Sequence, residues 1–276
     1  MLVTRFAPSP TGFLHLGHAF AALTAAAAGT RFLLRIEDID TGRTREEFVA
    51  AIFEDLHWLG LHWEEPALRQ STRGDAYREA LAWLEAQGIV YPCFCTRREI
   101  ADEMARAVEA PHGPDGPIYP GTCRHLPADE RAAKLAAGMP HALRLDAPKA
   151  AQIAGPLTFR EHDAAVAVQP LLFGDIVLAR KEIPAAYHLA VVVDDAFQGV
   201  TLVTRGADLL LATHVQRLLQ ALLGVPEPAY AHHRLILDAE GKKFSKRDRA
   251  ATLRSLREAG VTPAQLFKNL SSAASN

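Results

Sequence analysis

The segment from Arg5 to His18, RFAPSPTGFLHLGH, constrains the fold of this chain more than any other feature. The apolar run from Val3 to Ala7 predicts a short buried strand, and the proline- and glycine-rich Pro8 to Gly12 predicts a turn. An alanine-rich helix is predicted from Gly17 to Ala28, and a second strand from Arg31 to Glu37. Strand, helix and strand in this order form a parallel βαβ unit, which binds ligands at the carboxyl ends of its strands. We therefore expect an α/β fold with a ligand site beside this turn.

Two histidines flank a glycine where the turn enters the helix, at His15, Gly17 and His18. The N–H groups at a helix N-terminus are unpaired and carry partial positive charge, so phosphate groups bind there. Imidazole donors at the same place would stabilise negative charge that develops on a leaving phosphate. Gly17 would leave room for a flat base against the backbone. The alternative is an ordinary helix start with two solvated histidines.

A glycine followed by clustered cations, Gly241 to Arg247 (GKKFSKR), is a second candidate phosphate element. Such a loop can fold over a triphosphate and neutralise the charge that builds up during displacement. A short basic run alone is usually a surface loop, but its combination with His15 and His18 in an α/β chain favours phosphate binding. The cations near the C-terminus are Lys242, Lys243, Lys246, Arg247, Arg249, Arg254 and Arg257. We interpret them as facing a polyanion; a solvated helix face is the alternative.

Composition excludes several classes of protein. With 276 residues, 49% of them apolar and 22% charged, the chain is typical of a soluble globular protein of one or two domains. The net charge of −2 disfavours a protein that coats nucleic acid over a wide surface. Gly29, Thr30 and Arg31 end the alanine-rich stretch, so we expect no membrane span. The N-terminus has no secretory signal, and we expect a cytoplasmic protein.

The order of the predicted elements divides the chain into four segments. Thr44 with Glu47 is predicted to cap one helix, and a second helix is predicted from Asp75 to Gln87. From Tyr91 to Arg160 the pattern changes to cysteines and a proline- and glycine-rich loop, which indicates an insertion. The α/β pattern then returns as a strand at Ile176 to Ala179, a helix at Tyr187 to Phe197, a strand at Thr201 to Thr204 and a helix at Thr213 to Leu223. The expected boundaries are 1–90 and 161–235 for the two halves of the α/β domain, 91–160 for the insertion, and 236–276 for the basic loop and a helical C-terminal segment.

The insertion contains all three cysteines, Cys93, Cys95 and Cys123. A disulfide framework is not expected in a cytoplasmic protein. A Cys-x-Cys pair before a helix capped by Thr96 and Glu99, with a third cysteine in a loop, suits a structural zinc site that lacks one ligand. Candidates for that ligand are Tyr119, His112 and His125, and zinc-ligand chemistry alone favours a histidine. Three buried or free thiols are the alternative.

These motifs together resemble class I aminoacyl-tRNA synthetases. The segment from Arg5 to His18 is similar to their first signature in its glutamyl form, and Gly241 to Arg247 is similar to the second signature, with Phe244 for the usual methionine. The resemblance runs from Val3 to about Asp248. It implies a Rossmann-type catalytic domain with a small zinc-bearing insertion and a helical C-terminal segment.

The resemblance also implies the site residues. Arginine suits a carboxylate because its planar fork makes two parallel hydrogen bonds, and an acid suits an ammonium group. Arg5, Arg205 and Glu37 are candidates for these roles, although each taken singly would also suit a structural ion pair. Glutamate is expected to lie among Arg5, Ala7, Ser9, Glu37, Tyr187 and Arg205. ATP is expected to contact His15, Gly17, His18, Lys243, Ser245 and Lys246, of which His15, His18 and Lys246 are catalytic. For zinc, the resemblance selects Tyr119 to complete the set with Cys93, Cys95 and Cys123.

Because the chain ends about thirty residues after the second signature, it resembles the stand-alone glutamyl-queuosine tRNA(Asp) synthetases in particular. That family activates L-glutamate with ATP and Mg²⁺ and esterifies it to the queuosine base in the anticodon of tRNA(Asp). We expect a monomer with one structural zinc and no membrane partner. The family usually has serine or threonine followed by proline where this chain has Ala212-Thr213-His214. The resemblance therefore does not define the helix start or the ribose contacts at this segment. The alternatives are a truncated glutamyl-tRNA synthetase that charges the 3′ end of tRNA(Glu), a small-molecule nucleotidyltransferase, and a catalytically silent binding module.

Overall fold

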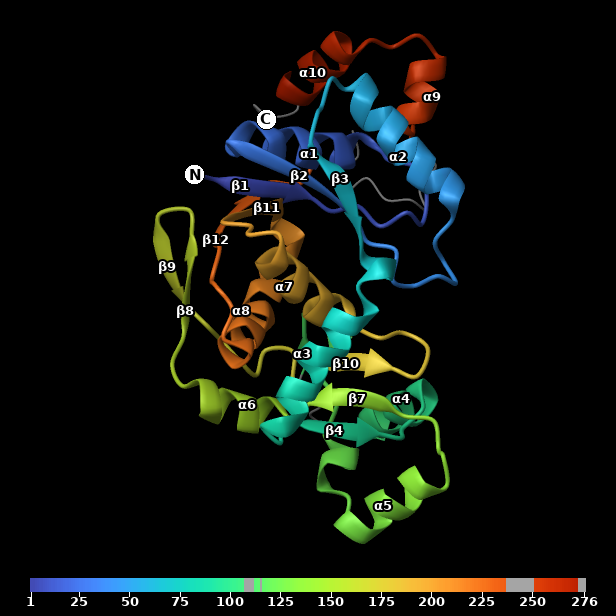
Figure 1. Cartoon of the computed structure of the whole chain (residues 1–276), viewed down its shortest axis with the longest axis vertical. Coiled ribbons are helices and arrows are strands. Elements are labelled where there is room, and N and C mark those ends of the chain that lie inside the picture. Colours follow the sequence, from blue (N-terminus) through green and yellow to red (C-terminus); the bar gives the residue numbers. More distant parts are fainter. Residues whose placement is uncertain (107–111, 115, 237–250, 273–276) are drawn as a thin grey trace.

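The computed structural model describes residues 1–106, 112–114, 116–236 and 251–272 (Figure 1). Two regions lie one above the other in this view. The upper one holds the N-terminal strands and both C-terminal helices, and the lower one holds the strands and helices of the insertion. The long helices α7 and α8 lie between them.

The N-terminal βαβ unit forms as predicted. Strand β1 (Val3–Phe6), helix α1 (Leu16–Ala28) and strand β2 (Arg31–Ile36) follow one another, and β2 pairs in parallel with both β1 and β3 (Glu64–Arg69). All four residues of β1 are buried, as a strand covered on both faces requires. Small side chains on α1, with Ala19, Ala22 and Ala25 fully enclosed, allow the helix to lie close to the sheet. The carboxyl ends of β1 and β2 therefore open at one edge.

A second set of strands continues beside β1. One sheet contains, in this order, the strands β11 (Leu202–Gly206), β12 (Ala229–His233), β8 (Thr158–Glu161) and β9 (Ala164–Ala167). Strand β12 pairs in parallel with both β11 and β8, and β8 forms an antiparallel hairpin with β9. The Thr201 N–H donates to the Val3 carbonyl at 3.0 Å, and the Val3 N–H donates to the Thr201 hydroxyl at 2.9 Å. These bonds place β11 next to β1, so its carboxyl end opens at the same edge.

The insertion is built around a separate antiparallel sheet. Strands β10 (Val177–Arg180), β7 (Ala142–Leu145) and β4 (Val90–Cys93) lie in that order. The predicted strand at Ile176 to Ala179 exists, but it pairs with β7 rather than with the parallel strands. The other elements of this region are α4 (Arg97–Arg106), β5 (His112–Gly113), β6 (Gly116–Pro117), the 3₁₀ turn η2 (Thr122–His125), α5 (Ala128–Ala136) and α6 (Ala147–Ala154).

Amphipathic helices connect the two regions. The predicted helices form as α3 (Gly74–Ala86), α7 (Tyr187–Phe197) and α8 (Ala212–Leu223), and they bury Leu84, Leu189 and Leu218 in one apolar core. Helices α9 (Leu253–Glu258) and α10 (Pro263–Ser272) add Leu253 and Leu266 to a second core with α1 and α2 (Glu46–Trp58). The remaining 3₁₀ turns are η1 (Gln70–Thr72) and η3 (Ala207–Leu209). In the described parts of the chain, no helix has the length and apolarity needed to cross a bilayer.

The two predicted helix caps have different outcomes. Thr96 and Glu99 form the predicted capping box, with the Thr96 N–H donating to the Glu99 carboxylate at 2.6 Å and the Glu99 N–H to the Thr96 hydroxyl at 3.2 Å. The predicted Thr44 cap is wrong. Helix α2 starts at Glu46, so Arg45 rather than Thr44 is the N-cap, and no side-chain hydrogen bond forms there. The Thr44 N–H closes a turn onto the Asp40 carbonyl, which keeps Thr44 outside the helix.

Candidate active site

The two histidines of the first motif lie against each other at the start of α1. His15 is the N-cap, and its Nδ1 accepts the Gly17 N–H at 3.1 Å. His18 Nδ1 in turn accepts the His15 N–H at 3.2 Å, and the ring centroids are 3.8 Å apart. Because each Nδ1 is an acceptor, the proton of each neutral ring lies on Nε2. The helix start therefore carries two imidazole donors as well as its partial positive charge.

Glycine at position 17 allows a close approach of the His15 ring, which the sequence did not reveal. A Cβ at Gly17 would lie 3.1 Å from His15 Cε1 and 3.2 Å from its Nδ1. A side chain there would require the His15 ring to shift by a few tenths of an ångström, which would strain its capping bond. The prediction that Gly17 makes room for a base remains a prediction.

The C-terminal segment returns to the same place. The Leu253 N–H donates to the Leu14 carbonyl at 2.8 Å, and Thr252 pairs with His15 in an antiparallel bridge. Ile236 packs in the apolar core that contains Leu14. Thr252 and Leu253, which follow 237–250, thus lie beside the start of α1, and Ile236, which precedes it, shares the core of Leu14. Lys243, Ser245 and Lys246 lie outside the described residues, as do Lys242, Arg247 and Arg249.

The two basic residues of the predicted cluster that the structure describes both lie on α9 beside an acid. Arg254 Nε is 3.1 Å from Glu258, and Arg257 Nη2 is 2.9 Å from Glu54 on α2. These pairs support the alternative of a solvated helix face for Arg254 and Arg257.

A cavity of about 410 Å³ lies at the carboxyl ends of β1, β2 and β11. All six residues expected around glutamate line it: Arg5, Ala7, Ser9, Glu37, Tyr187 and Arg205. His18 lines it too, so the cavity reaches the start of α1. Among the described residues, His15 and Gly17 are not part of its wall. Residues up to 200 positions apart in the sequence therefore meet in one site.

Arg5 is held in this cavity by a buried carboxylate. Its Nε and Nη2 donate to Asp195 on α7 at 2.9 and 3.3 Å. The same carboxylate accepts Arg35 Nη1 at 2.7 Å, and Arg35 Nη2 is 3.7 Å from Glu37. Burial opposes ionisation of Asp195, but the two arginines hold its pKa below the usual value. Burial raises the pKa of Glu37 against the attraction of Arg35 and Arg5. The positive charge of Arg5 is therefore largely balanced within the protein.

Arg205 is held differently, by uncharged groups. Its three guanidinium nitrogens donate to His232 Nε2 at 2.9 Å, to the Gln216 amide oxygen at 2.8 Å and to the Thr213 hydroxyl at 2.8 Å. Thr213 lies in the Ala212-Thr213-His214 segment, which therefore supplies a polar contact at the start of α8. Behind His232 lies the carboxylate of Glu161, 2.7 Å from His232 Nδ1.

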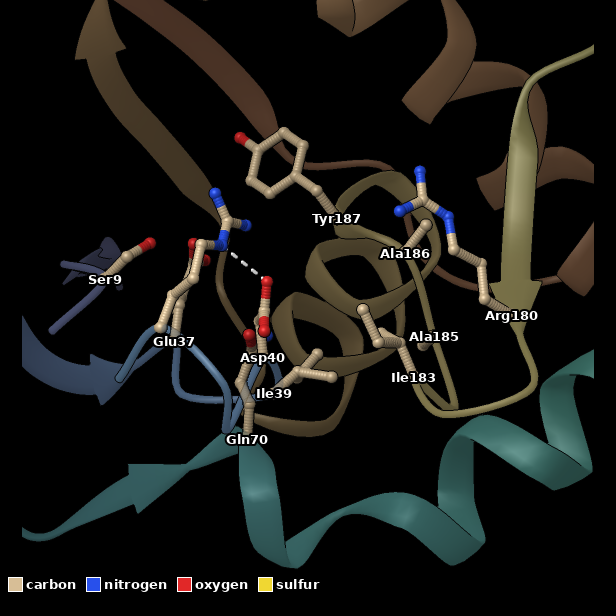
Figure 2. Close-up of a pocket in the computed structure, with 11 residues that line it drawn as sticks. Ser9, Glu37, Ile39, Asp40, Gln70, Arg180, Ile183, Ala185, Ala186 and Tyr187 are labelled. Atoms are coloured by element: carbon tan, nitrogen blue, oxygen red, sulfur yellow. Dashed lines mark hydrogen bonds and ion pairs between the residues drawn. The ribbon is translucent and has the colours of Figure 1, made fainter. Parts of the chain in front are cut away.

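A second cavity of about 220 Å³ adjoins the first (Figure 2). Ser9, Glu37 and Tyr187 line both cavities. The remaining wall is formed by Ile39, Asp40, Arg43, Gln70, Arg180, Ile183, Ala185 and Ala186. In the view of Figure 2, Tyr187 lies between Glu37 on one side and Arg180 of β10 on the other. This second cavity therefore extends from the residues expected around glutamate toward the insertion.

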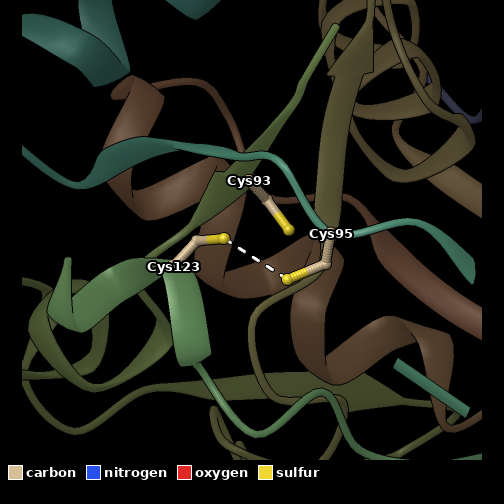
Figure 3. Close-up of side chains that lie close together, drawn as sticks. All are labelled: Cys93, Cys95 and Cys123. Carbon is tan, nitrogen blue, oxygen red and sulfur yellow. Dashed lines mark hydrogen bonds between the residues drawn. The ribbon is translucent and has the colours of Figure 1, made fainter. Parts of the chain in front are cut away.

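The three cysteines of the insertion meet in one cluster (Figure 3). Their sulfur atoms all lie within 4.8 Å of one another, and Cys95 Sγ is 3.4 Å from Cys123 Sγ. A tetrahedral zinc with Zn–S bonds of about 2.3 Å holds its sulfurs roughly 3.8 Å apart, so the cluster has a suitable size. Burial opposes ionisation of Cys123, but hydrogen bonds from the Tyr119 hydroxyl and the Phe94 N–H lower its pKa. Burial raises the pKa of the neighbouring Cys95 thiol to about 12, so a bound metal would have to displace that proton.

The fourth position of this cluster is next to Tyr119. Its hydroxyl oxygen is 3.4 Å from Cys93 Sγ and 3.6 Å from Cys95 Sγ, and it accepts the Cys123 N–H at 2.9 Å. His125 is exposed, and its Nε2 lies 3.4 Å from Arg124. The structure describes no side chain for His112. The three sulfurs are donors that zinc accepts, and the Tyr119 hydroxyl is the side-chain oxygen beside them that could complete the set.

Sequence reasoning missed the groups that position Arg5 and Arg205. Asp195, which Arg35 also contacts, holds Arg5, and His232, which Glu161 contacts, holds Arg205. One signal was present for Asp195. Asp194 and Asp195 follow three valines within one helix, and an acid on an apolar helix needs a buried partner. Asp194 has Tyr77, Gln70 and Arg73 as partners. No local pattern marked Glu161 or His232.

Comparison with known proteins identifies the family. Residues 1–273 match the family model "tRNA synthetases class I (E and Q), catalytic domain". Glutamyl-Q tRNA(Asp) synthetase of Rhodobacter capsulatus is 48% identical over 96% of this chain and 98% of its own length. The same-named protein of Symbiobacterium thermophilum is 45% identical over 98% of this chain and 85% of its own length.

Longer relatives match over only part of their length. Glutamate–tRNA ligase 1 of Methylococcus capsulatus is 40% identical, with 94% of this chain covering 56% of that protein. The crystal structure of glutamate-tRNA synthetase from Elizabethkingia anophelis superposes with a TM-score of 0.74 at 31% identity, over 90% of this chain and 53% of that one. The chain therefore belongs to the class I tRNA synthetases of the glutamate and glutamine type, and within them to the glutamyl-Q tRNA(Asp) synthetase family.

Proposed function

We propose that this chain activates L-glutamate with ATP and transfers it to the queuosine base in the anticodon of tRNA(Asp). One observation carries the proposal: the cavity that unites Arg5, Glu37, Tyr187 and Arg205 with His18 at the start of α1. Cations for carboxylates, an acid for an ammonium group and a helix N-terminus for phosphates are the groups that glutamate and ATP require. The near full-length similarity to glutamyl-Q tRNA(Asp) synthetases supports this acceptor.

The first step is an in-line displacement. An oxygen of the glutamate α-carboxylate attacks the α-phosphorus of ATP, the bond to the bridging oxygen breaks, and pyrophosphate leaves. The Nε2–H groups of His15 and His18, together with the helix N-terminus, stabilise the charge on the phosphates. Mg²⁺ bound with ATP shares that charge. Lys246 acts on the pyrophosphate; Thr252 and Leu253, which follow it in the sequence, lie beside His15 and Leu14.

The second step transfers the acyl group. A hydroxyl of the accepting base attacks the carbonyl carbon of glutamyl-adenylate, an ester bond forms, and AMP leaves. No protein nucleophile is needed, since position and electrostatics lower the barrier. The second cavity gives the acceptor a way in, because it shares Ser9, Glu37 and Tyr187 with the glutamate cavity. Arg180 of its wall suits a polyanionic partner, whereas Arg43 is paired with Asp40.

The cysteine cluster has a structural role in this proposal. Cys93 and Cys95, with Tyr119 and Cys123, would hold one zinc ion and tie the end of β4 to the turn η2. The ion lends the insertion stability and takes no part in the reaction. We also propose that the enzyme acts as a monomer in the cytoplasm, where ATP and tRNA are available.

The activation step is tested by ATP–pyrophosphate exchange, first without tRNA and then with it. The expected result is exchange that depends on L-glutamate and is much weaker with L-glutamine or L-aspartate. Absence of glutamate-dependent exchange under both conditions would overturn the proposal and favour a catalytically silent module.

A further inference from the structure

Arg205 lines the cavity, and none of the acidic side chains that the structure describes forms an ion pair with it. Its three hydrogen-bond acceptors, Thr213, Gln216 and His232, are uncharged. Arg5, the other arginine among the described residues of this wall, is paired with the Asp195 carboxylate. Arg205 is 94% removed from solvent, so its charge is weakly screened and acts strongly on a ligand.

The hydrogen bond to Arg205 defines which nitrogen of His232 carries the ring proton. Because Arg205 Nε donates to His232 Nε2, that nitrogen carries a lone pair and the ring proton lies on Nδ1. Nδ1 faces Glu161 Oε2 at 2.7 Å, and Glu161 Oε1 accepts the His232 backbone N–H at 2.9 Å. The ring also lies parallel to Tyr230, with an interplanar angle of 5°. Glu161 thus fixes the ring, and the ring fixes Arg205.

We propose, resting on the function above, that His232 is a positioning residue for glutamate binding. As a neutral acceptor, it orients the Arg205 guanidinium. As a spacer, it keeps the Glu161 carboxylate from direct contact with Arg205, which leaves the charge of Arg205 for a carboxylate of the substrate. A direct Glu161–Arg205 ion pair would orient the guanidinium equally well but would cancel that charge.

Two amide variants separate this role from simple packing. In His232→Gln the amide reaches the position of Nε2 and can still accept from Arg205. In His232→Asn the amide reaches only the position of Nδ1, so the bond to Arg205 is lost. In glutamate-dependent exchange, His232→Gln is expected to keep the KM for glutamate within about threefold of wild type. His232→Asn is expected to raise it about ten- to a hundredfold, with a smaller change in kcat.

The pH dependence provides a second readout. The groups that face His232 are Glu161 on β8, Arg205 on β11, His233 beside it on β12, and His162, whose Nε2 lies 3.3 Å from the His232 carbonyl. Burial, assisted by Arg205, lowers the pKa of His232 below its usual 6.5. Protonation there converts Nε2 into a donor and places two cations in contact. The KM of the wild type for glutamate should therefore rise as the pH falls through this pKa, whereas His232→Gln should lack that additional rise.

The result that overturns the inference is a His232→Asn enzyme with wild-type KM, or a His232→Gln enzyme with the same acid rise in KM as wild type. Thermal unfolding of each variant without substrate identifies a folding defect. If His232→Asn has such a defect, the inference is tested by two other measurements: the shift in Tm that glutamate causes, and the pH dependence of KM in wild type and His232→Gln. Wild-type exchange tests the proposed function itself. If the wild type shows exchange and the variants do not differ, the inference alone fails.

Discussion

The active-site cavity and the cysteine cluster are assembled in opposite ways. The cavity draws Arg5, Glu37, Tyr187 and Arg205 from separate strands and helices, and buried polar partners hold the arginines in place. The cluster draws all its donors from 93–123, and its sulfurs lie together at the edge of a small antiparallel sheet. The first site is organised by the protein core before any ligand binds. The second is expected to depend on a metal, so the two should respond differently to substitution.

Asp195→Asn should give the largest effect, on the cavity side of this comparison. The substitution removes the carboxylate that Arg5 and Arg35 share, and leaves the buried Arg5 without its ion-pair partner and Arg35 with only Glu37, at 3.7 Å. Breaking a buried ion pair in this way costs about 3–5 kcal/mol, which should appear as a lower free energy of unfolding in denaturant titration. Glu79→Gln, at an exposed position, is the control and should change it by less than about 0.5 kcal/mol. Equal stability of the two variants would mean that the cavity does not depend on its buried charges.

Lys246→Ala should affect chemistry without affecting the fold. If Lys246 stabilises the pyrophosphate, its loss should lower the rate of glutamate-dependent exchange by about two to three powers of ten. The unfolding midpoint should stay at its wild-type value. Near-normal exchange in this variant would show that the role is assigned to the wrong residue.

Zinc removal should affect stability on the cluster side and spare chemistry. With zinc at about 100 times its Kd, the bound ion stabilises the fold by roughly 2.7 kcal/mol. Chelation should therefore lower the Tm by several degrees, and the exchange rate measured well below that temperature should change little. Tyr119→Phe should weaken zinc retention, whereas His125→Ala, at an exposed residue away from the sulfurs, should not. Metal-free protein in elemental analysis, after purification without chelator, would remove the site.

Gly17→Ala should have the smallest effect and should separate catalysis from helix stability. Alanine is the better helix former by up to about 1 kcal/mol, but its Cβ would displace the His15 ring. We expect unchanged or slightly higher Tm and exchange slower by about tenfold. Gly74→Ala, at the start of α3, is the matched control, since its Cβ would meet only the mobile end of Arg78. Unchanged exchange in Gly17→Ala would argue against a role for the capped His15 geometry.

Local pattern and family resemblance predicted different parts of this molecule. Periodicity and breakers located β1, α1, β2, α7 and α8 to within about two residues, because those elements follow from local sequence. The pairing of β10 with β7 was not predicted, since the identity of a partner strand is not a local property. The failed Thr44 cap has the same origin, because a turn with Asp40 competes for it. The roles of Tyr187 and Arg205 came from resemblance, and the groups that hold the arginines became visible only in the fold.

Transfer of labelled glutamate tests the central claim most directly. The purified protein is incubated with radiolabelled L-glutamate, ATP and total tRNA from strains that make queuosine and from strains that lack it. The near full-length similarity to glutamyl-Q tRNA(Asp) synthetases predicts label only in the queuosine-containing pool, at the anticodon of tRNA(Asp). Equal labelling of both pools, at a 3′ end, would contradict it and would indicate a glutamyl-tRNA synthetase that acts on tRNA(Glu).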